Sequence, residues 1–222
     1  DIIEETNRSR LVGSAASDVR SCIAKIDVMQ RIANGFDPQI SIEAVKDSVY
    51  NLSAARKLIK SDIIFCCTDN LHSRMVVNRI AFQYLIALVD IGLELHASEG
   101  EIKAAGGRVM AVLPDGPCLD CMGVLDAQTI TDEISSLTRG SLTGGQYVRG
   151  QVVENPAVIS LNGVVASLGA TELLNLASGF ESRRADQTSK VYRALEGDVR
   201  LVEMRGVKTC GVCAQIQGKG DA

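Results

Sequence analysis

Apolar residues in the first half of the chain alternate between helical spacing and short unbroken runs. The first pattern predicts helices and the second predicts strands. The helical segments are 19–34, 52–59 and 72–84, and the strand-like segments are 40–45, 62–67, 85–91 and 107–113. Because residues 62–67 are mostly apolar, we expect a central strand that is buried on both faces. The alternation of strands and helices along the chain predicts a doubly wound, mostly parallel α/β sheet of Rossmann type, with helices on both faces.

The pattern changes in the second half of the chain. Residues 126–150 are polar and glycine-rich, which predicts a mobile loop or an excursion over a site. Residues 157–179 are strongly apolar, and strand-like stretches follow from Val191. With Glu172 as its only charge and several polar interruptions, the apolar segment fits a buried helix, such as one at a subunit interface, better than a membrane span. We therefore divide the chain into three parts: 1–125, 126–150 and 151–222.

Composition excludes several classes of protein. The chain has 222 residues, 46% hydrophobic and 23% charged, with a net charge of −4, which is typical of a folded domain and not of a disordered one. Its 23 basic and 27 acidic residues form no dense basic run, which argues against nucleic-acid binding. The N-terminus is acidic where a signal peptide would be basic. We expect a cytoplasmic protein with reduced thiols and with no membrane or nucleic-acid partner.

Four of the seven cysteines form two pairs with two residues between the members of each: Cys118 and Cys121, and Cys210 and Cys213. This spacing lets both thiolates of a pair face one metal ion, and two pairs complete a tetrahedral site for structural zinc. A redox-active pair and coincidence are the alternatives. The other three lie in apolar surroundings and are expected to be buried small hydrophobic residues, not nucleophiles: Cys22, Cys66 and Cys67.

Polar residues that could bind a nucleotide or a metal stand in two places. Asp69 lies in the turn Thr68-Asp69-Asn70 after the strand at 62–67, where ligands bind in doubly wound sheets. Asp and Asn are also common turn residues. Near the N-terminus, Asn7, Arg10 and Lys25 could grip a triphosphate, although their spacing alone favours solvated surface charges.

Four polar residues after this turn have less certain roles. Arg74 and Asn78 lie four residues apart on one face of the expected helix. Packing or hydrogen bonding at the helix start explains them as well as substrate contact does. Asp90 ends the next apolar run and ranks below Asp69 as a site residue. His72 is expected to be exposed at the start of the helix.

Together these motifs resemble the ThiF/MoeB/HesA family, the bacterial relatives of ubiquitin-activating enzymes, over nearly the whole chain. The stretch from Thr6 to Arg10 is similar to the family's Ser-Asn-x-x-Arg segment, and Lys25 falls near its following lysine. Residues 62–70 match its Cys-Thr-Asp-Asn stretch. Arg74 and Asn78 match the Arg and Asn that follow this stretch in the family. The two cysteine pairs match the family's zinc knuckles.

The resemblance implies adenylation: ATP and the C-terminal carboxylate of a ubiquitin-like or sulfur-carrier protein, or of a peptide, give an acyl-adenylate and pyrophosphate. Arg10 and Lys25 would hold the phosphates, Asn7 would bind the nucleotide, and Asp69 would hold magnesium. Residues 126–150 correspond to the family's crossover segment. Since they contain no cysteine, we expect an enzyme that stops at the adenylate or passes it to another protein's sulfur. The resemblance and the apolar helix also imply a homodimer.

The chain departs from the family at its beginning. The strand, glycine-rich loop and helix that bind ATP should precede Asp1. We therefore expect a truncated Rossmann-like adenylation core in 1–125, part of a longer protein, with weak ATP binding or none. The alternative is a natural pseudo-enzyme or a non-catalytic, zinc-stabilised scaffold that binds a carrier protein. An NAD-dependent oxidoreductase would need a dinucleotide-binding glycine loop that the chain does not show.

Overall fold

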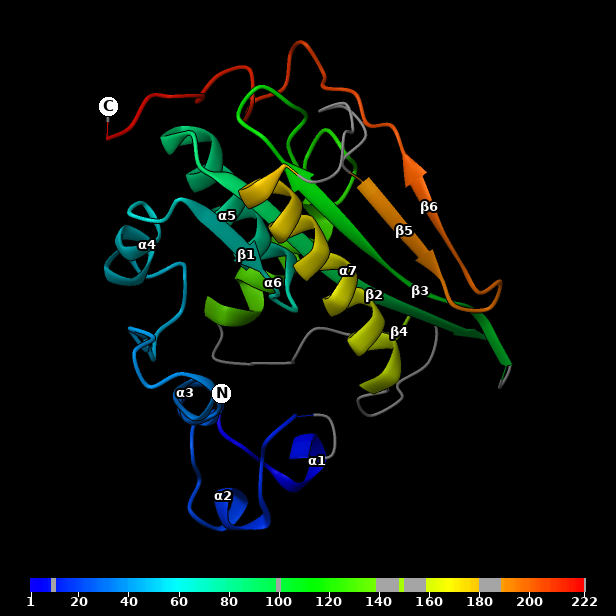
Figure 1. The fold of residues 1–222 in the computed structure, drawn as a ribbon. Coiled ribbons are helices and arrows are strands. Elements are labelled where there is room, and N and C mark those ends of the chain that lie inside the picture. Colours follow the sequence, from blue (N-terminus) through cyan, green and yellow to red (C-terminus); the bar gives the residue numbers. More distant parts are fainter. Residues whose placement is uncertain (9–10, 99–100, 139–147, 150–158, 180–188, 222) are drawn as a thin grey trace. The chain divides into compact units, whose positions relative to one another are not determined.

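The computed structural model describes residues 1–8, 11–98, 101–138, 148–149, 159–179 and 189–221. The chain forms two compact units, whose elements are labelled in Figure 1. The first unit is Asp1–Ser48 with Ala157–Ile159, and the second is Val49–Pro156 with Ser160–Ala222.

Three short helices lie in the first unit: α1 (Glu5–Arg8), α2 (Ala16–Arg20) and α3 (Lys25–Phe36). The prediction of one helix over 19–34 was wrong, because the chain breaks between α2 and α3. Cys22 has a φ of 48° there, in the left-handed region that does not continue a right-handed helix. Arg31 of α3 then reaches back to the Asp18 carboxylate of α2 with two hydrogen bonds of 2.8 and 2.9 Å.

The strand predicted over 40–45 is not formed, and this segment has no regular secondary structure. A strand needs a neighbour that pairs with its backbone N–H and C=O groups. None of the described strands pairs with 40–45. The alternation of apolar and polar residues therefore indicated that one side of this segment could be buried, but it did not show whether another strand lies beside it.

The second unit is built on a sheet of six described strands: β1 (Ile63–Cys66), β2 (Ala87–Ser98), β3 (Glu101–Val112), β4 (Val148–Arg149), β5 (Ser189–Arg193) and β6 (Asp198–Val202). Their order is β1-β2-β3-β5-β6, and β4 pairs with β2. Among them, β1/β2 and β2/β4 are parallel and the other three pairs are antiparallel. The prediction of a mostly parallel sheet was therefore wrong. β2 ends at Ser98 and β3 begins at Glu101, and so short a connection joins antiparallel strands.

β1 confirms the strand predicted at 62–67 and is parallel to β2, with Cys66 opposite Asp90. It was expected at the centre of the sheet, but it stands at one end of the described strand order. Its side chains are accordingly less enclosed than expected, and Phe65 is 36% exposed. An apolar run predicts a strand well, but it does not reveal how many neighbours the strand has.

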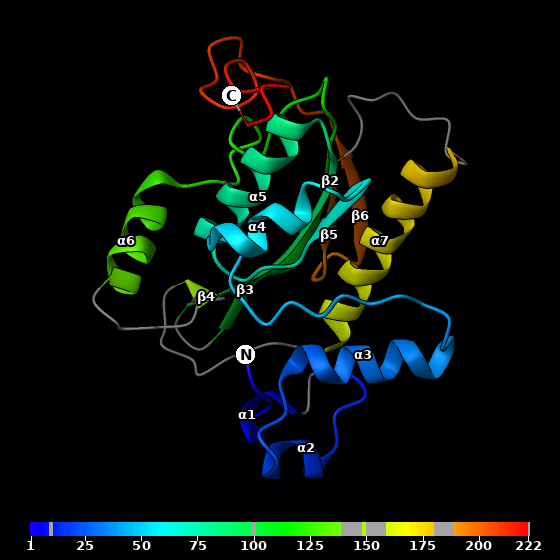
Figure 2. The same ribbon diagram turned by 90° about the vertical axis from the view of Figure 1, so that its left-hand side faces the viewer.

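Helices cover both faces of this sheet, as predicted (Figure 2). α4 (Leu52–Leu58) and α5 (Leu71–Tyr84) lie on one face, and α7 (Ile159–Ser178) lies on the other. Because successive strand residues point to opposite faces, Leu88 belongs to the core beneath α5 with Phe82, whereas Val89 packs with Val165 of α7. Two apolar layers thus share one sheet.

α7 confirms the predicted long apolar helix, but only one side of it is buried. Gly169 brings it close to the sheet, since a Cβ at this residue would lie 2.7 Å from Ile91 Cγ2. Glu172 is buried against Lys190 of β5, with 2.8 Å between their charged atoms. On the outer side, Leu174 is 60% exposed. By length and composition α7 is the one helix in the described residues that could cross a membrane, but its contacts with the sheet are those of a half-buried helix.

α6 (Ala127–Thr138) fills the first half of 126–150, where a loop was predicted. Ile130, Ile134 and Leu137 recur at helical spacing, and Ile130 is buried. The many polar residues between them concealed this narrow apolar stripe. Apart from β4, the glycine-rich remainder of this segment lies outside the described residues.

Candidate active site and metal centre

The turn Thr68-Asp69-Asn70 lies between β1 and α5, at the carboxyl end of the strand. Asn70 is the N-cap of α5, and its side-chain oxygen accepts a hydrogen bond from the Ser73 N–H at 2.8 Å. Asn70 Nδ2 also donates to Asp69 Oδ1 at 3.2 Å. Asp69 is exposed, so the turn presents a carboxylate to solvent at the carboxyl end of the parallel pair β1/β2, the end at which ligands bind in open α/β sheets.

A buried ion pair ties this turn to β2. Arg74 of α5 donates to Asp90 Oδ1, to the Thr68 carbonyl, and at 3.0 Å to the Ile91 carbonyl. The side chain of Arg74 is 7% exposed and that of Asp90 is 0% exposed. Of the two interpretations left open for Arg74, the structure shows packing and hydrogen bonding at the helix start.

A second arginine faces the same carboxylate. Arg108 of β3 has its Nη2 3.8 Å from Asp90 Oδ2, and its guanidinium lies over Gly92, where a Cβ would come within 3.1 Å of it. Burial raises the pKa of Asp90, and both arginines oppose that rise. Burial also lowers the pKa of Arg108. No local pattern indicated this role for Arg108, because its meeting with Asp90 depends on the register of β2 and β3.

Two other residues of α5 have internal roles. Asn78 is buried, and its side-chain oxygen accepts a hydrogen bond from the Leu119 N–H at 3.0 Å, which joins α5 to the first cysteine turn. His72 was expected to be exposed but is half-buried. Its ring stacks on Tyr50 with 4.6 Å between centroids, and its buried Nδ1 has no partner among the described residues. The sequence could not show this contact, because Tyr50 lies before α4.

The three cysteines outside the pairs have different environments. Cys66 is buried, as predicted, whereas Cys22 and Cys67 are exposed, so the prediction was wrong for these two. Burial raises the pKa of the Cys66 thiol, and enough atoms surround the Cys67 sulfur to raise its pKa to about 11. Neither thiol is therefore ionised at neutral pH, which argues against a nucleophile at this turn.

The three N-terminal candidates belong to the first unit. Arg10 lies outside the described residues. Lys25 forms an exposed ion pair with Asp1, with 2.9 Å between the charged atoms. Such a pair contributes about 0–1 kcal/mol to stability, so Lys25 can readily change to another partner. Asn7 is buried, and its amide bonds the Glu4 N–H at 3.0 Å and the Ile2 carbonyl at 3.2 Å. In this structure, Asn7 therefore organises the start of α1.

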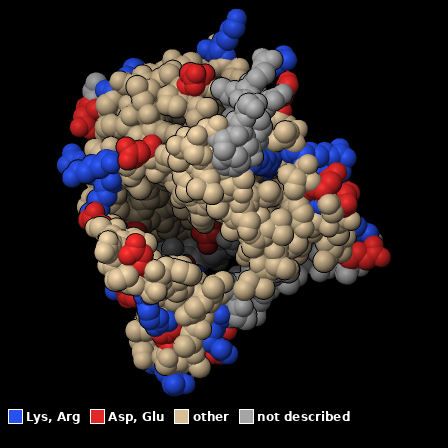
Figure 3. Space-filling model, in the orientation of Figure 1, with Lys and Arg blue, Asp and Glu red and all other residues tan. Residues whose placement is uncertain are grey.

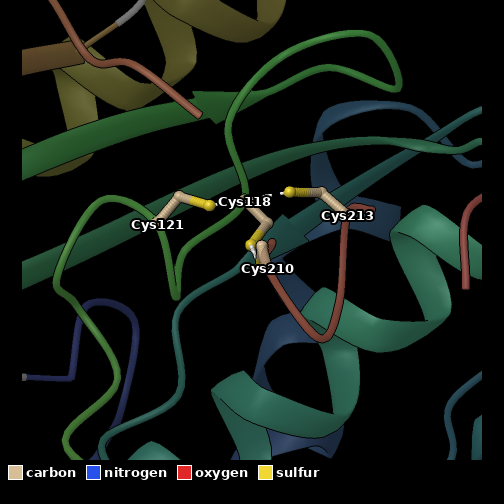
Figure 4. A group of neighbouring side chains, drawn as sticks. All are labelled: Cys118, Cys121, Cys210 and Cys213. Carbon is tan, nitrogen blue, oxygen red and sulfur yellow. Dashed lines mark hydrogen bonds between the residues drawn. The ribbon is translucent and has the colours of Figure 1, made fainter. Parts of the chain in front are cut away.

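The four paired cysteines come together, as predicted. Their Sγ atoms all lie within 4.8 Å of one another, with 3.5 Å between Cys118 and Cys210 and 3.5 Å between Cys121 and Cys213. Figure 4 shows the sulfur atoms converging from the turn after β3 and from the C-terminal tail. A tetrahedral zinc ion with bonds of about 2.3 Å would separate its sulfur ligands by about 3.8 Å. The geometry and the donor set fit a four-sulfur metal centre.

The electrostatics of this cluster point the same way. Burial raises the pKa of the Cys118 and Cys213 thiols. Burial acts on Cys210 in the same sense, but backbone N–H groups, including that of Val212 at 3.4 Å, outweigh it and lower its pKa. Four thiols packed this closely are costly to ionise together, and a bound dication would remove that cost.

The tail beyond the cluster is held by the end of α5. The Gly218 N–H donates to the Phe82 carbonyl at 2.9 Å, and the Gly220 N–H donates to the Gln83 carbonyl at 3.0 Å. Carbonyls in the last turn of a helix have no partner within the helix, and the tail supplies one. α5 therefore carries the candidate active-site turn at its start and the cysteine-bearing tail at its end.

Comparison with known proteins assigns the chain to a family. The model of the ThiF family matches residues 1–212. The chain belongs to the ThiF family. It is 24% identical over 217 residues to the SAMP-activating enzyme E1 of Haloferax volcanii, covering 97% of this chain and 69% of that protein. It is 23% identical over 192 residues to the molybdopterin-synthase adenylyltransferase of Escherichia coli K12, covering 86% of this chain and 66% of that protein.

Solved structures of E. coli MccB share the Rossmann-like fold of this ThiF-family chain. The structure of MccB with ATP superposes with a TM-score of 0.69 at 17% identity, covering 96% of this chain and 57% of MccB. A further MccB structure, with AMPCPP and MccA, has a TM-score of 0.68. The chain thus spans from 57% to 69% of the length of these relatives.

Proposed function

We propose that this ThiF-family chain forms the core of an ATP-dependent adenylyltransferase that acts on the C-terminal carboxylate of a ubiquitin-like or sulfur-carrier protein, or of a peptide. The names of its relatives, an activating enzyme and an adenylyltransferase, support this proposal. So do the nucleotides and the MccA present in the MccB structures. In the chain itself, the exposed carboxylate of Asp69 at the carboxyl end of β1 carries the proposal.

In this reaction, a carboxylate oxygen of the substrate bonds to the α-phosphorus of ATP while the bond to the β-phosphate oxygen breaks. Pyrophosphate leaves, and its developing charge has to be neutralised. Arg10 and Lys25 would hold the phosphates, and Lys25 would give up its exposed ion pair to do so. Asn7 would bind the nucleotide, and to do so its amide would give up its hydrogen bond to the Glu4 N–H or to the Ile2 carbonyl. Asp69 would hold magnesium, which neutralises phosphate charge when bound.

Pyrophosphate exchange, measured on the whole protein of which this chain is the proposed core, tests this proposal. With a suitable carrier, Asp69→Ala should lower the exchange rate on the order of 100-fold or more, because it removes a preorganised charged group that would hold magnesium at the phosphates. Asp62→Ala is the matched control, since Asp62 is an exposed aspartate at the other end of β1. The proposal would be overturned if none of the candidate carriers supports exchange, or if the two variants exchange pyrophosphate at equal rates. Zinc binding without nucleotide binding in calorimetry would instead favour a scaffold.

We also propose that Cys118, Cys121, Cys210 and Cys213 hold one zinc ion. Four sulfur ligands leave no open coordination position, so the ion would be structural and would take no part in adenylation. All seven cysteines lie outside disulfide bonds. We include a cytoplasmic location in the proposal, because thiols stay reduced there.

We propose a homodimer that covers the outer side of α7. Val164 is 38% exposed and Leu174 is 60% exposed, and the helix has no charge other than the buried Glu172. In Figure 3 charged side chains of both signs are scattered over the face drawn. Leu174→Glu should convert a dimer to a monomer in light scattering, whereas Ser160→Glu at an exposed polar position should not. A monomeric wild type would contradict the proposal.

A further inference from the structure

The first N–H groups of α5 are all satisfied within the protein. The Leu71 N–H donates to Glu133 Oε1 at 3.1 Å, and the His72 N–H donates to Glu133 Oε2 at 2.7 Å. The next two N–H groups donate to the side chain and the carbonyl of Asn70, at 2.8 and 3.4 Å. A helix start normally leaves about four N–H groups without partners. Here the N–H groups of Leu71, His72 and Ser73 donate to side-chain oxygens of the protein, and that of Arg74 makes the first bond of the helix itself, so these groups are not left for a phosphate group.

Glu133 reaches this helix start from another element. It lies on α6, 62 residues from Leu71 in the sequence. Its two oxygens accept from two successive amides, at the positive end of the α5 dipole, and hydrogen bonds of this charge-assisted kind are stronger than neutral ones. Ile130, nearly one turn earlier on α6, is buried and anchors the helix. Glu133 therefore clamps α6 to the residues that directly follow the candidate metal turn.

We infer that Glu133 is a positioning residue for adenylation, which fixes the carboxylate of Asp69 by holding the start of α5; this inference rests on the proposed function. Arg74 holds the turn on one side of Asp69, through the Thr68 carbonyl. Glu133 holds it on the other side, through the Leu71 N–H. Without Glu133, the Leu71 and His72 amides lose their partners, and Asp69 occupies a range of positions in place of one.

Kinetics of pyrophosphate exchange separate this role from a general effect on folding. Glu133→Ala should lower kcat about 10- to 100-fold, because a misplaced group is costly in the transition state, and should change KM for the carrier little. Glu133→Gln keeps one acceptor oxygen and should have an intermediate kcat. Asp132→Ala is the control, since Asp132 is an exposed carboxylate on the same helix that bonds Gln128 at 3.1 Å. It should match the wild type.

Hydrogen exchange provides a second measurement. The amides of Leu71 and His72 should exchange faster in Glu133→Ala, less so in Glu133→Gln, and at the wild-type rate in Asp132→Ala. Equal kcat values for Glu133→Ala and Asp132→Ala in an active enzyme would overturn the inference and leave the proposed function standing. No exchange of pyrophosphate by the wild type would overturn both. If Glu133→Ala fails to fold, Glu133→Gln decides, and a wild-type kcat in that variant would overturn the inference.

Discussion

The carboxylate of Asp18 is stabilised in its charged form by its neighbours. Arg31 donates to both of its oxygens, at 2.9 and 2.8 Å, and the Ala15 N–H donates to Oδ2 at 2.7 Å. These contacts, with that of Arg31 the larger, lower the pKa of Asp18 to about 2. One side chain thus joins α2, α3 and the residue before α2.

This shift predicts an acid-sensitive contribution to the stability of the first unit. The pKa of Asp18 is lower in the folded state than the value of about 3.9 in an unfolded chain, so its contribution is complete above about pH 4 and is lost as the pH falls towards 2. In denaturation followed between pH 5 and 2, Asp18→Asn should flatten this decline. Arg31→Met should flatten it less, because the Ala15 N–H remains. A decline unchanged in Asp18→Asn would contradict the prediction.

Residue environments near the active-site turn were predictable where the signal was local. An Asp-Asn pair after an apolar run indicated a turn with an exposed carboxylate, and Asp69 confirms it. Cys67 was wrongly predicted to be buried: it directly follows the buried Cys66, and successive residues of an extended chain point to opposite sides. The ion pair of Arg74 with Asp90 depends on strand register, and the clamp by Glu133 depends on where α6 docks. Neither leaves a trace in local sequence.

Among the elements, α7 shows how one residue sets the distance between a helix and a sheet. Gly169 faces Phe65 of β1 and Ile91 of β2, with no room for a Cβ. Gly163 lies on the same helix, where a Cβ would have nothing within 4 Å of it. The two glycines therefore provide the same substitution in opposite environments.

Alanine at these positions should change stability in opposite directions. Gly169→Ala should destabilise the protein by about 1–3 kcal/mol, because the new methyl overpacks the helix against the sheet. Gly163→Ala should stabilise it by up to about 1 kcal/mol through helix propensity alone. Urea denaturation measures both. Stabilisation by Gly169→Ala would show that α7 does not pack as closely as described.

Elements were predictable from the sequence when their apolar pattern was broad and their partners were present. The helices at 52–59 and 72–84 and the strand at 62–67 are confirmed. The strand at 40–45 failed for want of a pairing partner, and α6 was missed because its apolar stripe is narrow. The single helix over 19–34 failed because spacing alone cannot reveal a residue such as Cys22 with a positive φ.

At the scale of the whole molecule, the cysteine pairs were predictable because each pair is a local motif. Their meeting was inferred from chemistry, since two pairs complete one set of four ligands. The antiparallel majority of the sheet was not foreseen, because it follows from connections that local pattern does not define.

Metal removal should loosen the molecule as a whole. Protein purified without chelator should contain about one zinc ion per chain, and Cys213→Ser should lose it while Cys67→Ser keeps it. A cross-link over about 100 residues contributes ~4 kcal/mol, so chelation should lower Tm by about 8–16 °C. Metal analysis and thermal denaturation measure these effects. Absence of zinc, or a disulfide between Cys118 and Cys121, would contradict the prediction.

The sulfur cluster joins positions that are 92 residues apart in the chain, with α6, α7 and the last two strands between them. A metal ion there would connect the two ends of this stretch a second time, in addition to the peptide backbone. If the backbone were severed between α6 and α7, both fragments would still share the ion, β-sheet pairing and the contacts of the tail with α5. Such a split protein should remain assembled in the presence of zinc, and chelation should weaken the association of the two fragments, so that the metal would control how tightly they bind each other.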